Sequence, residues 1–446
     1  MSSDIHPDLR LPAPVLEIAA ALERAGFETW CVGGGVRDAL LGRVHLDWDL
    51  ATAARPAQVR KLFRRTVPIG VDFGTIGVLD DAGTMHEVTT FRRDVRTDGR
   101  HAEVEFGASL DDDLARRDFT VNAIAYSPSR DAIHDPFGGR EDLARRVIRS
   151  VGDPDERMRE DRLRALRAIR FAARFGFTIE PATWRALERS APHLGRLSAE
   201  RVRQELEKTM EQVDRPGSAL AMWRDGGALA TLVPSLAGIG AVTLASLDAI
   251  PRATRPRQEH RTTDRLTALF ADLAPREAER TLRALRFSNA QAAWISEVLG
   301  RWRRVAPTLG PALRAETEVS DVELRRWVSA TGRLHVRAVW RLAAARLAAA
   351  RGEAVPQGRW TLVHSLYRRA LWTAFRSGNA LDLTDLAVDG DDLRTAGIPA
   401  GPLLGTILTQ LLGVVIGDPS RNRREWLVER ALELYRGPAG EPPGEL

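Results

Sequence analysis

Apolar and polar residues alternate with two different periods along the chain, and the change of period divides it into two parts. Residues 14–26 carry apolar positions at helical spacing and end at a glycine, and the short apolar run 28–32 is typical of a strand. A further helix is expected over 57–65, with strands over 74–79 and 85–90. From about residue 153 onward, the patterned segments have the helical period. The pattern predicts an α+β fold, in which an α/β head with a small mixed sheet precedes an all-α remainder.

Polar links divide the helical remainder further. The segment 251–265, PRATRPRQEHRTTDR, is basic and interrupted by proline, so it marks a boundary between helical regions. The last residues, GPAGEPPGEL, are expected to form a disordered tail. We therefore predict four domains: a head at 1–152, a helical neck at 153–250, a helical body at 251–378 and a helical tail at 379–446.

Composition narrows the class of protein. With 446 residues, 44% of them hydrophobic and 28% charged, the chain is typical of a soluble globular protein of two to four domains. The single cysteine, Cys31, excludes an internal disulfide and a multi-cysteine zinc site. No signal peptide and no apolar run of ~18 residues is present, so we expect no membrane span and a cytoplasmic location. A net charge of +5, carried mainly by arginine, suits a polyanionic partner.

Two aspartates one residue apart, Asp47 and Asp49, stand on a predicted strand within VGGGVRDALLGRVHLDWDLAT, residues 32–52. Because side chains alternate across a strand, both carboxylates are expected to face one way and Trp48 the other. Two carboxylates on one strand face can hold a pair of hard cations ~4 Å apart. An isolated Asp-x-Asp is more often a solvated loop, but the glycines close by favour a metal site.

The glycine run before these aspartates predicts a phosphate cradle. Gly33, Gly34 and Gly35 let the backbone approach a ligand, and a helix expected to start near Val36 would point free N–H groups at it. Arg37 adds positive charge. The stretch contains neither GxxxxGK[ST] nor GxGxxG, so it is not one of the common glycine-rich nucleotide motifs.

The order GG-x-VRD and then D-x-D resembles the signature of the class II template-independent nucleotidyltransferases, which are the CCA-adding enzymes and bacterial poly(A) polymerases. The resemblance covers nearly the whole chain. It implies a nucleotidyltransferase head whose Asp47 and Asp49 hold Mg²⁺, with Gly34 and Arg37 on the triphosphate of the incoming nucleotide.

Glu87 lies on a defined face of the predicted strand 85–90. It is either a third carboxylate beside the aspartate pair or an exposed residue of an edge strand. The family places an acid in such a strand, so the resemblance implies a catalytic role for Glu87.

The segment LARRDFTVNAIAY, residues 114–126, resembles the second motif of the family. The resemblance implies that Arg117 pairs with phosphate, while Asp118 and Asn122, four apart on a predicted helix face, hydrogen-bond a ribose hydroxyl. An ordinary capped helix would look similar. The polar residues before it, 91–110, are expected to form a mobile loop.

A charged face runs along the helix predicted over 157–177. Such a face is usually a solvated surface or a ladder of salt bridges. The segment EDRLR fits the family motif EDxxR, however, whose side chains act as a protein template for the base. The residues that we assign to nucleotide recognition on this face are Glu160, Asp161, Arg164, Arg167 and Arg170.

The chemistry of this template is simple. Cytosine and adenine each present an amino donor beside a ring-nitrogen acceptor, and uracil presents the reverse. A carboxylate such as Asp161 accepts from the amino group, and a guanidinium such as Arg164 donates to the ring nitrogen, so uracil would meet like groups. Arg167 and Arg170 are expected to meet the triphosphate or the RNA end.

Residues 386–427 resemble the C-terminal tail domain of bacterial CCA-adding enzymes, which grips the outer part of tRNA. A helical hairpin that only completes the fold is the alternative. The whole resemblance implies addition of CMP and AMP, from CTP and ATP, to the tRNA 3′ end. A poly(A) polymerase, an enzyme that adds only CC or only the last A, and a non-catalytic RNA-binding protein remain open. The sequence gives no indication of the oligomeric state.

Overall fold

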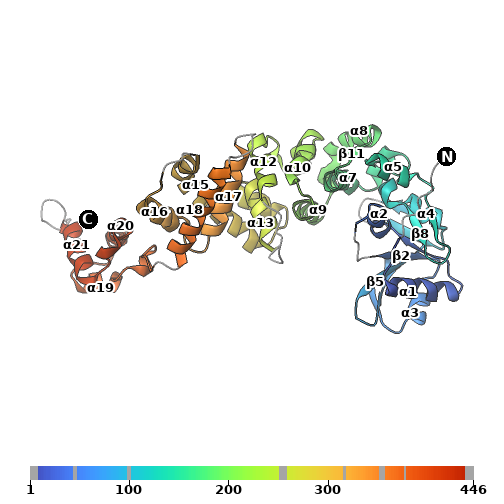
Figure 1. Ribbon diagram of the computed structural model, residues 1–446, viewed down its shortest axis with the longest axis horizontal. Coiled ribbons are helices and arrows are strands. Elements are labelled where there is room, and N and C mark those ends of the chain that lie inside the picture. Colours follow the sequence, from blue (N-terminus) through green and yellow to red (C-terminus); the bar gives the residue numbers. More distant parts are fainter. Residues whose placement is uncertain are drawn as a thin grey trace. The chain divides into compact units, whose positions relative to one another are not determined.

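The computed structural model describes residues 9–43, 48–97, 102–250, 259–314, 318–350, 357–375 and 378–436. The chain divides into two compact units, Met1–Gly238 and Ile239–Leu446, and each is described by itself (Figure 1). The first unit contains a mixed sheet and then helices, and the second is helical, so the predicted α+β fold is confirmed.

A seven-stranded sheet forms the core of the first unit, in the order β3-β4-β5-β2-β1-β8-β9. The strands are β1 Thr29–Val32, β2 Asp49–Thr52, β3 Thr66–Gly70, β4 Thr75–Leu79, β5 Met85–Thr90, β8 Ala125–Ser127 and β9 Ala132–His134. Strand β2 runs parallel to β5, with Leu50 opposite Val88, and the other neighbouring strands are antiparallel. The strands expected at 28–32, 74–79 and 85–90 are thereby confirmed.

Both faces of the central strands are covered, which explains why β1 is buried at all four of its residues. Helices α1 (Ala13–Arg24) and α3 (Pro56–Leu62) contact each other and strands of the sheet. A second apolar cluster joins Trp30 and Val32 to Leu110 and Leu114 of helix α4 (Leu110–Ala115). Cys31 lies between Trp30 and Val32 on β1, so its side chain points to the opposite face of the sheet. It is fully buried, and burial raises the pKa of its thiol above the usual range.

Two local predictions in this unit are wrong. The residues expected to form a polar loop at 91–110 instead contain an antiparallel hairpin of β6 (Arg92–Thr97) and β7 (Ala102–Phe106). The helix expected near Val36 is present as α2 (Gly34–Leu40), which starts two residues earlier. Asn122 lies in a short 3-10 turn, η2 (Thr120–Asn122), and Asp118 precedes it, so the two residues do not share an α-helical face.

The helix predicted over 157–177 is two helices, α6 (Pro154–Glu160) and α7 (Leu163–Phe175). Asp161 is extended, with φ −145° and ψ 102°, and its carboxylate accepts from the backbone N–H of Leu163. This bond satisfies one of the free donors at the start of α7, so the break also caps the second helix. Further helices complete the unit: α5 Gly139–Arg145, α8 Pro181–Ser190, α9 Ala199–Gln212, α10 Pro216–Asp225 and α11 Ala228–Leu232.

The second unit consists of helices. These are α12 Ala241–Ala249, α13 Glu259–Leu269, α14 Pro275–Ala284, α15 Asn289–Arg314, α16 Asp321–Thr331, α17 Val336–Ala349, α18 Gln357–Phe375, α19 Gly390–Thr395, α20 Pro402–Gly417 and α21 Arg424–Arg436. The last three share an apolar core centred on Leu393, Leu411 and Leu427. In the ranges that the structure describes, no helix combines the length and apolar character needed to span a bilayer.

Gly139, the first residue of α5, packs directly against the η2 turn. A Cβ atom at this position would lie 2.2 Å from the backbone oxygen of Thr120 and 2.8 Å from Cγ1 of Ile124. Backbone atoms cannot move aside as the end of a long side chain can. The sequence therefore needs glycine here for α5 to support the turn that carries Asn122.

We predict that Gly139→Ala lowers the free energy of unfolding by about 2 kcal/mol, because the added methyl group overlaps fixed backbone. Urea unfolding followed by circular dichroism measures the change. Gly195→Ala is the matched control, since its Cβ would lie 3.8 Å from Thr231 Cγ2, an ordinary contact. Equal stability of the two variants would contradict the packing described here.

Candidate active site

A cavity of about 470 Å³ opens between the sheet and the helices α7 and α9 of the first unit. Its described lining is strongly cationic, with seven basic side chains and three carboxylates. The lining residues are Gly33, Gly34, Arg37, Asp49, Arg116, Arg117, Asp118, Asn122, Asp161, Arg167, Arg170, Phe171, Arg174, Lys208 and Gln212. Such a lining suits a polyanion that carries a few groups for hydrogen bonding.

One corner of the cavity is formed where β1 ends and β2 begins. Val32 pairs with Asp49, so the glycine that follows Val32 lies beside the Asp49 carboxylate. Gly33 has φ +75°, and a Cβ there would lie 2.9 Å from Arg117 Nη1 and 3.5 Å from Asp49 Oδ2. The carboxylate of Asp49 and the guanidinium of Arg117 can both approach the backbone at position 33 because glycine has no side chain there. Any larger residue would push them apart.

The second carboxylate of the predicted pair, Asp47, lies outside the described residues. Strand β2 begins at Asp49, and Trp48 before it is buried. In the parallel pairing of β2 with β5, Leu50 lies opposite Val88. Asp49 and Glu87 each come one residue before this pair, so the two acidic side chains lie on the same face of neighbouring strands. Carboxylate oxygens are the ligands that a hard divalent cation prefers, so the side chains of Asp49 and Glu87 fit such an ion. The structure describes no group of three or more potential metal ligands within the ranges given above.

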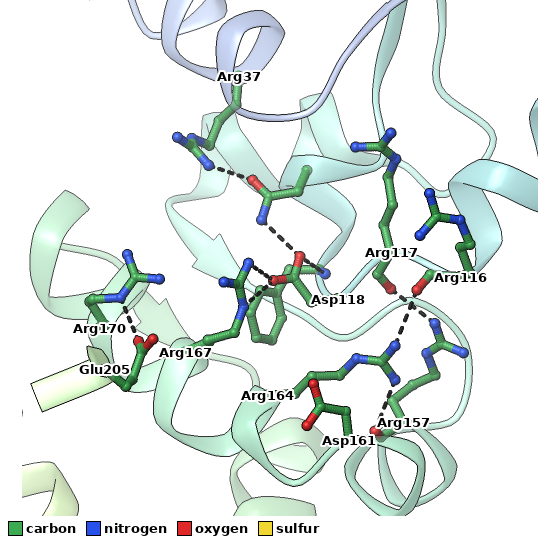
Figure 2. Close-up of polar contacts among 12 residues, drawn as sticks. Arg37, Arg116, Arg117, Asp118, Arg157, Asp161, Arg164, Arg167, Arg170 and Glu205 are labelled. Carbon is green, nitrogen blue, oxygen red and sulfur yellow. Dashed lines mark hydrogen bonds and ion pairs between the residues drawn. The ribbon is translucent and has the colours of Figure 1, made fainter. Parts of the chain in front are cut away.

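Asp118 is the centre of a polar chain that crosses the cavity wall (Figure 2). Its Oδ2 accepts from Nε and Nη2 of Arg167 at 2.9 and 2.6 Å, and its Oδ1 accepts from the amide of Asn122 at 2.9 Å. Asn122 in turn accepts from Nη1 of Arg37 at 2.5 Å. Burial disfavours the charged carboxylate, but the charge of Arg167 and these hydrogen bonds outweigh it and lower the pKa of Asp118 to about 2.

Arg37 lines the cavity, but most of its side chain is buried against other residues of the protein. The residue is only 3% exposed, its Nε donates to Asp38 at 2.8 Å, and its guanidinium lies 4.6 Å from the ring centre of Phe175. Burial lowers the pKa of Arg37. Since Asp38 and Asn122 already occupy donors of Arg37, its predicted contact with the triphosphate remains a prediction, and the observed contacts join α2 to α7.

Arg170 is similarly anchored. Its Nε donates to Glu205 of α9 at 2.5 Å, and its Nη1 donates to Gln212 at 3.0 Å. Burial lowers the pKa of this guanidinium, and Glu205 opposes the shift. Arg174 also donates to Gln212, at 3.3 Å. The arginine face predicted on α7 is therefore neither a solvated surface nor a ladder of salt bridges within one helix. The residues that bond to these arginines lie on α9 and in the head.

The predicted base-reading residues are placed differently from one another. Asp161 lines the cavity and accepts from Nη2 of Arg201 at 2.7 Å. The guanidinium of Arg164 donates to the backbone oxygens of Arg157 and Arg116 (Figure 2). It also donates to Glu160, and Arg164 does not belong to the described lining. Three of its five N–H groups are used in this way, which leaves two donors outside these bonds. The direct roles predicted for Arg164 and Glu160 stay predictions.

Helix α9 contributes side chains to the cavity that were not predicted from the sequence. Glu205, Lys208 and Gln212 are spaced i, i+3 and i+7, so they share one helical face, and that face lies toward Arg170 of α7. The only signal in the sequence was that α9, like α7, has a charged face. Such a face cannot be distinguished from a solvated surface unless one knows which helices pack together.

Comparison with known proteins gives consistent matches. A model of the "Poly A polymerase head domain" matches residues 29–149, and one of the "Probable RNA and SrmB- binding site of polymerase A" matches residues 176–239. The chain is 34% identical to a CCA-adding enzyme of Geobacillus kaustophilus (strain HTA426) over 423 residues, which cover 93% of this chain and 96% of the relative. It is 33% identical to one of Streptococcus pneumoniae (strain CGSP14), covering 92% and 94%.

Solved structures resemble the chain over nearly its whole length. The crystal structure of the Bacillus stearothermophilus CCA-adding enzyme in complex with CTP gives a TM-score of 0.71 at 33% identity, and covers 94% of this chain and 98% of that one. The Thermotoga maritima CCA-adding enzyme complexed with tRNA-CCA gives a TM-score of 0.63 at 22% identity, covering 96% and 97%, which is a likeness of fold.

We predict that Asp118→Asn destabilises the protein by about 2 kcal/mol at pH 7, because one pKa unit is worth about 1.4 kcal/mol and the native pKa of about 2 lies below the ordinary value of 3.8. A lowered native pKa stabilises above pH 3.8 and loses that contribution as the pH falls toward 2. The difference between variant and parent should therefore shrink between pH 5 and pH 3, as measured by urea unfolding. Asp81→Asn, at an exposed turn, should change stability by less than about 0.5 kcal/mol. A difference that grows on acidification would contradict the assignment.

Proposed function

The chain belongs to the family of CCA-adding enzymes, and from this premise we propose that its head adds CMP and AMP, without a nucleic-acid template, to the 3′ end of tRNA. CTP and ATP are the proposed nucleotide substrates. The observation that carries the proposal is the corner in which the Asp49 carboxylate and the Arg117 guanidinium both approach the bare backbone of Gly33. A tRNA substrate implies that the reaction takes place in the cytoplasm.

Members of this nucleotidyltransferase family use a divalent metal ion, and we propose that it is Mg²⁺ here. Asp47 and Asp49 would hold a pair of such ions for two-metal phosphoryl transfer, and Glu87 would assist the ion at the RNA 3′-hydroxyl from the neighbouring strand. When bound, one ion would lower the pKa of that hydroxyl, and the other would neutralise charge on the triphosphate. Asp49, Glu87 and the glycine corner supply oxygen ligands and backbone that fit this role.

The remaining lining residues would position the nucleotide. Arg117 and the backbone at Gly34 would receive the triphosphate, because both lie at the corner beside Asp49. Asp118 and Asn122 would bind the ribose. Both are already fixed by Arg167 and Arg37, so little rotamer freedom would be lost on binding.

Base selection is assigned to Asp161 and Arg164. Asp161 would accept from the amino group of cytosine or adenine at the cavity surface. Arg164, held from behind by Glu160 and two backbone oxygens, would donate through its remaining N–H groups. Uracil would meet a carboxylate at its carbonyl and a guanidinium at its N–H, which is repulsive on both sides.

The four-domain division stays a proposal: a catalytic head at 1–152, a neck at 153–250 that reads the base, a body at 251–378 and a tail at 379–446 that binds tRNA. Alternative activities within the class are poly(A) synthesis and addition of only CC or only A. A non-catalytic RNA-binding protein is the alternative outside it, and the presence of acidic side chains at positions 47 and 49 is evidence against that alternative.

We predict that Asp49→Ala reduces kcat for CMP incorporation at least about 1,000-fold, since loss of a metal-binding carboxylate removes several kcal/mol of transition-state stabilisation. Thermal unfolding and tRNA binding should change little, because Asp49 is a partly exposed residue at a strand end. Asp72→Ala, at an exposed turn of the head, is the control and should remain active. Full activity of Asp49→Ala would contradict the assignment of this corner as the catalytic site.

One assay separates the alternatives. tRNA ending at the discriminator base, tRNA-C, tRNA-CC and an unstructured RNA are each incubated with CTP, ATP or UTP. Completion of CCA on tRNA supports the proposal. Long A tracts on any RNA would identify a poly(A) polymerase, and incorporation that stops at CC or begins only at tRNA-CC would identify a partial adder. No incorporation would favour the binding protein.

We predict that Asp161→Asn raises the ratio of kcat/KM for UTP to that for CTP by about tenfold or more. The asparagine keeps an oxygen for the N–H of Leu163, so the start of α7 is retained, but it offers a donor where the parent only accepts. Steady-state incorporation on tRNA-C measures the ratio. Asp153→Asn is the control, because Asp153 caps α6 in the same way and lies outside the described cavity lining. An unchanged ratio for Asp161→Asn argues against a base-reading role.

A further inference from the structure

The arginines that line the cavity all have protein partners. Arg37 is bonded to Asp38 and Asn122, Arg116 and Arg117 to Asp113, and Arg167 to Asp118. Arg170 and Arg174 share Gln212. These guanidiniums are fixed donors, suited to a ligand that must always lie in one place.

Lys208 is the exception among the cationic lining residues. It is exposed, and no hydrogen bond or ion pair joins its ammonium group to a residue that the structure describes. Its backbone is nevertheless rigidly placed, because Glu205 and Gln212 on the same face of α9 are bonded to Arg170. Lys208 thus presents a compact charge on a flexible stem from a fixed base.

The type of residue is itself informative. Only two lysines, Lys61 and Lys208, occur in a chain whose lysines and arginines together number 65. An arginine at position 208 would carry a planar fork with five donors, which favours one fixed geometry. The lysine instead has three rotatable donors that can follow a moving oxygen.

From these observations we propose that Lys208 binds a phosphodiester group at the 3′ end of the RNA substrate. The inference rests on the proposed function, in which the RNA end grows by one nucleotide at each step. The incoming triphosphate is assigned to the corner of Gly33 and Arg117, where the donors are fixed. The terminal phosphates of the RNA must shift between steps, so an unpartnered and mobile charge fits them better than it fits the nucleotide.

The test compares Lys208→Gln and Lys208→Arg with Lys61→Gln, which removes the only other lysine at an exposed site of α3. Fluorescence anisotropy measures Kd for tRNA-C and tRNA-CC at several salt concentrations, without turnover. For Lys208→Gln we expect about a five- to tenfold rise in Kd near 0.1 M salt and a salt slope reduced by about one. KM for CTP and ATP should stay within twofold. Lys208→Arg should recover part of the affinity, and Lys61→Gln should match the parent.

A second measurement locates the contact directly. Periodate converts the terminal ribose of tRNA-C into a dialdehyde, which forms an imine with a lysine amine by loss of water, and cyanoborohydride reduces the imine to a stable secondary amine. Peptide mapping should find the RNA on Lys208 and not on Lys61.

Labelling of Lys208 by oxidised CTP but not by oxidised tRNA, or a raised KM for nucleotide with unchanged tRNA affinity, would overturn the proposal in favour of a nucleotide contact. Unchanged tRNA affinity and KM in Lys208→Gln would also overturn it. These outcomes are separate from failure of the proposed function, because tRNA binding is measured whether or not any nucleotide is added.

Discussion

The ion pair between the largely buried carboxylate of Asp118 and the partly exposed guanidinium of Arg167 is the interaction on which the rest of the site depends. Asp118 follows α4 of the head, and Arg167 lies at the middle of α7, so one ion pair fixes the wall in which both stand. A buried carboxylate without its cation would be strongly unfavourable, which makes the arrangement specific as well as stable. From this pair, hydrogen bonds lead through Asn122 to Arg37. The catalytic corner at Gly33 and the helical part of the cavity thereby belong to one connected polar structure.

Part of this site could be predicted from the sequence for a physical reason: local rules on glycine turns and strand alternation point to Gly33 and Asp49. Arg117, Asp118 and Asn122 were predicted instead from the resemblance of residues 114–126 to the second motif of the family. The structure brings these five residues, with Asp161, Arg167 and Arg170, to a single cavity. The strand containing Glu87 was also correctly bounded, and its parallel pairing with β2 puts Glu87 on the expected face.

What the sequence did not give depends on contacts between distant segments. The segment expected as a polar loop forms the hairpin of β6 and β7, whose two arms pair with each other. The second arm, AEVEF, does alternate apolar and acidic residues as a strand would, but this short signal stands in an otherwise polar segment. The break between α6 and α7 depends on Asp161 bonding to Leu163, and helical periodicity continues across it. The inward turn of Arg164 and the wall supplied by α9 follow from helix packing. Periodicity shows that a face is charged, but not what lies opposite.

The imbalance of charge in the cavity also has a cost. Seven basic side chains and three carboxylates are gathered there among the described residues. Like charges at such proximity repel, but Asp38, Asp113 and Glu205, which pair with lining arginines, offset most of the remaining charge. A bound polyphosphate or RNA end adds further negative charge and favours the native state by mass action. Occupancy of the cavity and resistance to heat are therefore linked, because the free energy of unfolding is larger when substrate is bound.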